Sequence, residues 1–229
     1  MNDMSDLLGG YYTVPDAARL LEVAPQKVRG WLAGYPRTKA DPLLENEVGW
    51  AEKRFALSFT NLMEVRFVAA FSGIGVQTRA IREMLTEAKE LLKHPHPFAT
   101  NAIFKTDGKR IFVEAAEATE DRVLYDLQAK NWAMHEIIVQ SLIDGVEYDP
   151  QGDAKAWHPR RYEAPNVIVR AAQAFGQPIM DESGVPTRIL FDAFLAEGET
   201  EESVSRWYGV NPETVKEAVR FETLLKRAL

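Results

Sequence analysis

Residues 13–32 read TVPDAARLLEVAPQKVRGWL, and this stretch decides the fold that we expect for the first part of the chain. Thr13 is a preferred N-cap residue and Asp16 follows three positions later, so a helix begins here. After a connection of three residues, Pro25 stands where a second helix can begin, because proline is favoured in the first helical turn. Two short helices with such a connection match the spacing of a helix-turn-helix, which we place at residues 13–34.

The side chains of these two helices divide into an apolar and a polar face. Helical spacing directs the apolar residues toward a core, and they are Ala17, Leu20, Leu21, Val28, Trp31 and Leu32. The outer face of the second helix carries Gln26, Lys27 and Arg29. Such side chains read base edges in the major groove, and Lys and Arg also contact phosphates. The alternative is an ordinary solvated face, but the spacing favours DNA recognition.

The next segment, residues 35–57, predicts a β-hairpin, or wing. It contains glycine, proline and scattered charges, followed by two short runs with strand character. We expect the tip of this wing near residues 37–42. Basic residues at the tip and on the second strand are candidates for contacts with a groove or with the DNA backbone. The predicted DNA-binding residues are therefore Gln26, Lys27, Arg29, Arg37, Lys39, Lys53 and Arg54.

Two helices are expected after the wing, over residues 58–71 and 77–93, where apolar residues recur at helical spacing. The first of them is too apolar for a lone surface helix. We interpret it both as part of the core and as the seam of a homodimer. The predicted dimer residues are Leu62, Val65, Phe67 and Phe71.

The middle of the chain is expected to contain small β-hairpins. Asp107-Gly108 suits a type I′ turn, so the apolar runs at 103–105 and 110–113 are predicted to pair as strands. The remaining elements that we expect are a short strand over 123–127, a helix over 134–143 and a second hairpin of residues 146–148 and 155–157.

A polar segment that contains prolines, residues 158–165, predicts a domain boundary. Together with the end of the wing, it divides the chain into three expected domains: residues 1–57 with the helix-turn-helix, 58–157 with the helical and hairpin region, and 158–229 with a helical tail.

The tail echoes the first helices. Helices are expected over 188–196 and 201–208, and Asn211-Pro212 opens a last helix as N-cap and first residue. Aligning Thr13 with Thr200 without a gap brings further identities into register, namely Arg19 with Arg206, Val23 with Val210, Pro25 with Pro212 and Val28 with Val215. The match predicts that both ends of the chain share a helix-turn-helix-like shape.

The two copies differ in charge. Bases outnumber acids from Pro15 to Lys39, whereas acids outnumber bases from Asp192 to Glu217. DNA phosphates attract the first pattern and repel the second. We therefore infer that the first copy binds DNA and the second binds protein.

Composition narrows the class of protein. The 229 residues are 46% hydrophobic and 27% charged, which is ordinary for a folded chain. No apolar run approaches the roughly 18 residues of a membrane span, and the first ten residues lack the features of a secretory signal. The absence of cysteine excludes disulfides and fits a reducing cytoplasm, where we expect the protein. The net charge of −7 argues against nonspecific nucleic-acid binding, although one basic face is enough for a specific reader.

No pattern of residues indicates catalysis or a bound metal. His94 and His96 stand two positions apart without a third ligand nearby, so we expect no metal site. The motifs of zinc proteases, phosphate-binding loops and serine hydrolases are missing from the sequence. We expect neither an enzyme nor a cofactor.

Three parts of the chain resemble known families. Residues 13–32 with the following wing, together with Ala80–Leu85, resemble the winged DNA-binding domain of MerR-type regulators. Residues 165–221, with Phe175–Ile179 and Thr187–Ile189, resemble the family described as domain of unknown function 433. In this order the parts resemble long VapB-type antitoxins. That resemblance implies that the protein binds a PIN-like ribonuclease toxin and represses the promoter that the two genes share.

One segment between these parts mixes aromatic and basic residues and looks exposed. As a hypothesis, it docks on a ribonuclease whose active site is a cluster of carboxylates, while a plain charged linker explains the segment equally well. The tentative toxin-binding residues are Trp157, Arg160, Arg161, Tyr162 and, further along, Arg188.

These observations predict a mainly α fold with small β-hairpins, in the α+β class. We expect an antitoxin that acts as an autorepressor, a homodimer on a palindromic operator that also neutralises a PIN-like ribonuclease toxin. The alternative is a MerR-like transcriptional regulator that has no toxin partner and whose middle region senses a small molecule.

Overall fold

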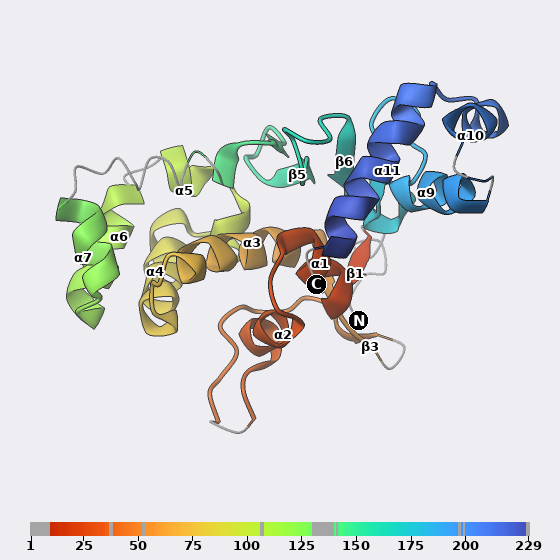
Figure 1. Ribbon diagram of the computed structural model, residues 1–229. Helices are drawn as coiled ribbons and strands as arrows, with labels where there is room; N and C mark the ends of the chain where they lie inside the picture. The colour runs from red at the N-terminus through yellow and green to blue at the C-terminus, as the bar shows by residue number, and fades with distance from the viewer. Residues whose placement is uncertain are drawn as a thin grey trace.

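The computed structural model describes residues 10–36, 39–51, 54–105, 108–129, 140, 142–196, 198 and 200–227. It is mainly helical, with two small antiparallel sheets, which confirms the predicted fold class. The helices α6 and α7 lie at one end, α9 and α10 lie at the other, and α2 projects from the middle (Figure 1). No helix in the described ranges is long and apolar enough to cross a membrane.

The chain begins with the two short helices that the sequence predicts. Helix α1 (Val14–Leu21) starts with a capping box, in which the Thr13 side chain accepts from Asp16 N and the Asp16 carboxylate accepts from Thr13 N. Glu22 adopts the left-handed conformation, with φ of 55°, and ends α1. Helix α2 (Pro25–Ala33) follows, with proline at its start. We call α1 and α2 with their connection the head unit.

The first sheet forms the wing, but its tip does not lie where the sequence predicted it. Strands β1 (Tyr11–Thr13), β3 (Arg54–Ser58) and β2 (Gly49–Ala51) pair in the order β1-β3-β2, so the hairpin turns between residues 51 and 54. The described part of the predicted tip, residues 39–42, belongs instead to a separate loop that Tyr35 and Ala40 close by an isolated bridge.

The misplaced tip has a physical cause in the core. Leu43 and Leu44 are buried, and their amides both donate to the carbonyl of Trp31 at 2.8 and 2.9 Å. The chain therefore returns to α2 before it can form the hairpin. The alternation of apolar and polar residues does not by itself predict that Leu43 and Leu44 pack and hydrogen-bond against α2.

Helices α3 (Phe59–Gly73) and α4 (Thr78–Leu92) lie where the sequence predicts them, and a 3-10 turn, η2 (Pro97–Ala99), packs against both. Stacked rings join these elements, since Phe67 lies between Phe71 at 4.8 Å and Phe98 at 3.8 Å between centroids. The four predicted dimer residues are all buried inside the single chain: Leu62, Val65, Phe67 and Phe71. Their interpretation as core is confirmed, whereas in this arrangement they offer no surface to a second copy.

The predicted hairpin at residues 103–113 and the strand at 123–127 are wrong. The chain forms three helices there, α5 (Ala102–Lys105), α6 (Gly108–Thr119) and α7 (Arg122–Ala129). Ile111, Phe112, Ala115 and Ala116 are buried at helical spacing, and this stripe packs α6 against α4. Asp121 caps α7 by accepting from the amides at 123 and 124. Most of the helix predicted over 134–143 lies outside the described residues.

The second sheet contains the predicted second hairpin. Strands β4 (Val146–Tyr148), β5 (Ala154–Trp157), β6 (Val167–Arg170) and β7 (Pro178–Met180) pair in sequence order, all antiparallel. The short turn η3 (Ala174–Gly176) connects the last two strands.

The tail has the three helices that the sequence predicts: α9 (Thr187–Ala196), α10 (Glu201–Tyr208) and α11 (Pro212–Arg227). We call α10 and α11 with their connection the tail unit. Helix α11 lies against both β6 and α1, so the two ends of the chain meet (Figure 1). Gly10 N also donates to the Ala171 carbonyl at 2.6 Å. The predicted domain boundaries stay a prediction.

Candidate nucleic-acid interface

The exposed side of α2 is the first part of the interface. Successive helical residues are about 100° apart, so Gln26 and Arg29 lie about 60° apart on one face, whereas Lys27 lies about 160° from Arg29. All three are exposed. Lys27 instead lines a pocket of about 440 Å³ between α2 and α3, together with Arg66. The three predicted recognition residues therefore occupy two different sides of the helix.

The wing contributes an aromatic side chain that the sequence reasoning missed. The Arg29 guanidinium lies 5.5 Å from the ring centroid of Trp50 and 5.9 Å from that of Phe55. The two rings face one another across β2 and β3, edge to face at 5.7 Å. Trp50 is 65% exposed. A cation–π contact of this kind orients the guanidinium and leaves its donors free for a ligand.

Strand register is what brings Trp50 to Arg29. The run of residues 49–51 indicates a strand, but only its pairing with β3 places Trp50 opposite Phe55. The sequence predicts the hairpin tip at residues 37–42, and that position does not bring Trp50 opposite Phe55.

Of the other four predicted basic residues, the structure describes Arg54 and Lys39. Arg54 is exposed at the start of β3. Lys39 is exposed in the loop after α2, with φ of 53°. Arg37 and Lys53 lie outside the described residues. The ring of Tyr35 packs closely on Gly30, where an added Cβ would lie 2.0 Å from it, so this loop runs directly beside α2.

A network of hydrogen bonds holds the root of the wing. The Asn61 amide nitrogen donates to the Glu45 carbonyl at 2.7 Å, and its side-chain oxygen accepts from Glu47 N at 3.2 Å. The Asn46 side chain donates to the Ala56 carbonyl at 2.9 Å. These bonds connect the segment before β2 to α3 and β3, so they set the direction in which the wing leaves the core.

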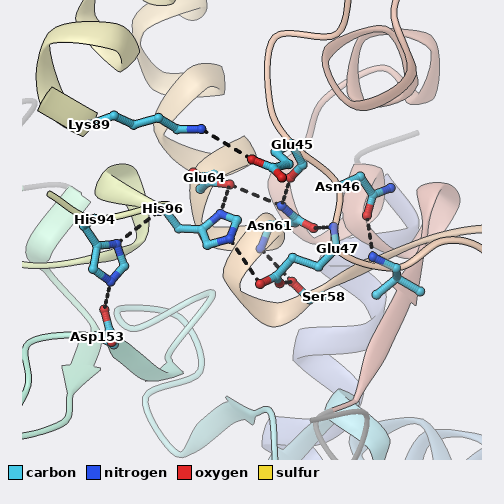
Figure 2. A network of polar contacts seen from close by, with 11 residues as sticks. Glu45, Asn46, Glu47, Ser58, Asn61, Glu64, Lys89, His94, His96 and Asp153 are labelled. Carbon is cyan, nitrogen blue, oxygen red and sulfur yellow. Dashed lines mark hydrogen bonds and ion pairs between the residues drawn. The ribbon is translucent and has the colours of Figure 1, made fainter. Parts of the chain in front are cut away.

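A buried histidine lies at the centre of this network. His96 Nδ1 lies 3.1 Å from Glu64 Oε2, and its Nε2 lies 3.1 Å from Glu47 Oε1 (Figure 2). Both carboxylates accept, so both ring nitrogens must donate, which requires the imidazolium. The hydrogen bonds that His96 donates to Glu47 and Glu64 raise its pKa to about 10, against the opposing effect of burial. The same contact with His96 lowers the pKa of Glu47.

Neighbouring contacts extend the network to α4 and the second sheet. The Lys89 ammonium lies 3.7 Å from a Glu45 carboxylate oxygen (Figure 2). His94 Nε2 lies 3.1 Å from Asp153 in the β4–β5 turn, and its Nδ1 accepts from His96 N. The wing, the long helices and the second sheet are therefore joined at one place.

Three of the five tentative toxin-binding residues are exposed, namely Arg161, Tyr162 and Arg188, and their role in binding a toxin stays a prediction. Trp157 is buried, with the Arg66 guanidinium 5.2 Å from its ring. Arg160 pairs with Glu22 at 2.5 Å, in the connection of the head unit. The remaining three have partners on the surface of the chain, since Arg161 and Tyr162 both bind Asp144 and Arg188 binds Asp192.

One protein of known sequence and one solved structure each match most of this chain. No family model matches the chain, so neither the MerR-like nor the domain 433 resemblance is confirmed. The chain is 25% identical over 224 residues to a Mycobacterium tuberculosis protein named "Putative antitoxin VapB45", covering 91% of this chain and 92% of that protein. The X-ray structure of Rv2018 from Mycobacterium tuberculosis matches 91% of this chain and 96% of its own, with a TM-score of 0.71 and 23% identity. The same fold therefore exists in an experimental structure.

The raised pKa of His96 predicts how stability depends on pH. In the folded chain the pKa is about 10, above its ordinary 6.5, so this group stabilises the fold fully below pH 6.5 and loses the effect as pH rises toward 10. We expect the unfolding free energy of the wild type to fall between pH 7 and 9, by up to about 1.4 kcal/mol per pH unit. His96→Gln is expected to be destabilised at pH 7 by about 3 kcal/mol and to show a flatter profile.

Urea denaturation at several pH values measures both quantities. His94→Gln is the matched control, because His94 contacts a single carboxylate and is more exposed. Equal pH slopes for the wild type and His96→Gln would contradict the assignment of a buried imidazolium.

Proposed function

We propose that this protein is an antitoxin of a type II toxin-antitoxin system, which represses its own promoter and neutralises a PIN-like ribonuclease toxin. The observation that carries the proposal is the whole-chain similarity to a relative named as an antitoxin. Two helices with helix-turn-helix spacing and an adjacent wing support the DNA-binding part. The protein acts by binding its partners in the cytoplasm, without catalysis.

DNA binding in this proposal uses the face shared by α2 and the wing, in the manner of a MerR-like reader. Arg29 and Gln26 reach base edges in the major groove, since these side chains can form paired hydrogen bonds with guanine and adenine. Trp50 orients Arg29 and packs against the backbone, where Arg54 contacts phosphate. Lys27 lies on the other side of α2 and is assigned a phosphate contact.

The remaining parts of the chain have other roles in the proposal. Residues 1–57 form the DNA-binding domain, 58–157 the middle region and 158–229 the antitoxin-associated tail. A homodimer would present two head units to a palindromic operator. Its seam must use surface residues, because the four side chains first considered are buried in one chain.

The two sides of α2 predict different effects on DNA binding. Arg29→Ala is expected to weaken binding to the protein's own promoter about 10-fold or more and to relax its sequence preference, because a base contact is lost. Lys27→Ala should weaken all sequences similarly and reduce the salt slope by about one. Fluorescence anisotropy at several salt concentrations measures both.

The tail unit supplies a matched control for this experiment. Lys216 is the tail residue in register with Arg29, and Lys216→Ala is expected to bind as the wild type does. Weaker binding by Lys216→Ala, with Arg29→Ala unchanged, would contradict the assignment of the head unit as the DNA reader.

Toxin neutralisation is tested with the neighbouring gene. We expect a short PIN-like reading frame beside this one, and we expect its tagged product to co-purify with this protein after co-expression. Addition of the protein should suppress the ribonuclease activity of that product on a fluorescent RNA. Absence of such a gene, or of any complex between the two products, would contradict the antitoxin role.

One pocket favours a second candidate function, regulation by a small ligand. It has a volume of about 480 Å³, lies between head and tail, and is lined in part by Tyr12, Arg19, Phe175 and Glu222. The Tyr12 hydroxyl and Glu222 Oε2 are buried without a hydrogen-bond partner in the described part of the chain. The Arg19 guanidinium lies 4.0 Å from Glu222 Oε2, so a ligand with an N–H donor would complete the hydrogen bonding of that carboxylate.

Mass spectrometry of the purified protein under native and denaturing conditions tests this second candidate. A small molecule that the wild type releases on denaturation, and that Glu222→Gln does not carry, would favour ligand-responsive regulation. A wild-type protein with only the mass of its chain would count against it.

A further inference from the structure

The tail unit repeats the geometry of the head unit, residue by residue. Their first helices both end in the left-handed conformation at matching positions, Glu22 with φ of 55° and Gly209 with φ of 64°. The backbone bonds around the connection also match, since Val23 N donates to Ala18 O at 3.0 Å and Val210 N donates to Ser205 O at 3.1 Å. The second helices begin in the same way, at Pro25 and Pro212. The shape shared by both ends is therefore confirmed.

The two units differ on one face of their first helix. In the head unit Leu20 is 3% exposed, and α1 packs against both α3 and α11. The residue in register with Leu20 is Trp207, which is 77% exposed. Its neighbour Tyr208 is 41% exposed, whereas Leu21 of the head unit is half-buried. The face that helices cover in the head unit is thus uncovered in the tail unit, where it carries two large aromatic residues.

Large exposed aromatic residues such as Trp207 and Tyr208, on a helix face that nothing in the described part of the chain covers, indicate a contact with another protein. Tryptophan and tyrosine are enriched among the residues that contribute most to binding between proteins. An indole with most of its surface in water gives little to the fold of its own chain, while burial against a partner removes a large apolar area from solvent.

The charges around the tail unit select the partner. Glu201 and Glu202 lie in the first turn of α10, and Glu213 lies in the first turn of α11. Glu213 is in register with Gln26 of the head unit, and it pairs with Lys216 at 3.4 Å. Carboxylates at these positions repel nucleic acid and attract a basic protein surface.

A second copy of this chain fits the same face poorly. A two-fold contact would bring together two tail units that each carry an excess of carboxylates, and like charges in an interface are unfavourable.

We propose that the face of α10 formed by Trp207 and Tyr208 is the docking site for an amphipathic, basic helix of the toxin. This inference rests on the proposed antitoxin function. The apolar side of the partner helix covers the two rings, as α3 and α11 cover α1 in the head unit. Its lysine and arginine side chains pair with Glu201, which lies about 20° from Tyr208 around α10, at the edge of the contact.

The binding constant of the purified toxin tests the proposal, measured by calorimetry against the full-length protein. Trp207→Ala is expected to weaken binding about 30-fold or more, as removal of a central aromatic anchor does. Glu201→Lys should also weaken binding, and by more at low salt than at high salt. Tyr125→Ala is the matched control, since Tyr125 on α7 is also an exposed aromatic residue and lies outside the tail unit. It should bind as the wild type does.

Two further measurements keep the outcomes distinct. Trp207→Ala should keep its melting temperature and its operator binding, because the side chain is exposed and far along the chain from the head unit. Amide exchange in the complex should slow over α10.

A toxin that binds the wild type and Trp207→Ala equally would overturn the docking site while leaving the antitoxin function intact. A Trp207-dependent dimer of this chain with unchanged toxin affinity would overturn it too. A wild type that binds no toxin would overturn the proposed function itself.

Discussion

The imidazolium of His96 between Glu47 and Glu64 is the interaction on which the arrangement of the wing depends. It joins the segment before β2 to α3 and to the turn after α4, and Asn61 completes the same network. A buried charge is costly unless it is fully paired, so this site tolerates one arrangement of its neighbours. The wing consequently has a defined direction relative to α2, and Trp50 meets Arg29 as a result of it.

The same helix-turn-helix shape serves two purposes in this chain because its surroundings differ. In the head unit the first helix is covered by other helices, which leaves the second helix and the wing exposed beside one another. In the tail unit one face of the first helix is left uncovered and displays Trp207. Charge follows the same division, so the proposed roles of DNA reader and protein binder arise from one backbone pattern with different side chains.

Several features could be predicted from sequence because they are local. Capping residues, proline at helix starts and apolar spacing are sufficient to locate α1, α2, α10 and α11. The wrong predictions occur where contacts between residues far apart in the sequence determine the local structure. Asp107-Gly108 suited a hairpin turn, but the apolar residues that follow pack as a helical stripe on α4, and this packing prevails over the turn preference. Arg160 looked free, yet it pairs with Glu22 more than a hundred positions away.

The sequence by itself determined the mainly helical class, the repeated unit and the opposite charge of its two copies, because each depends on neighbouring residues or on composition. Only the tertiary structure decided which side chains share a face with Arg29, where the wing turns, that the proposed dimer seam is core, and which copy leaves one face of its first helix uncovered. The physical reason is that strand register, burial and the pairing of charges join residues far apart in the chain, and no local pattern records those partners.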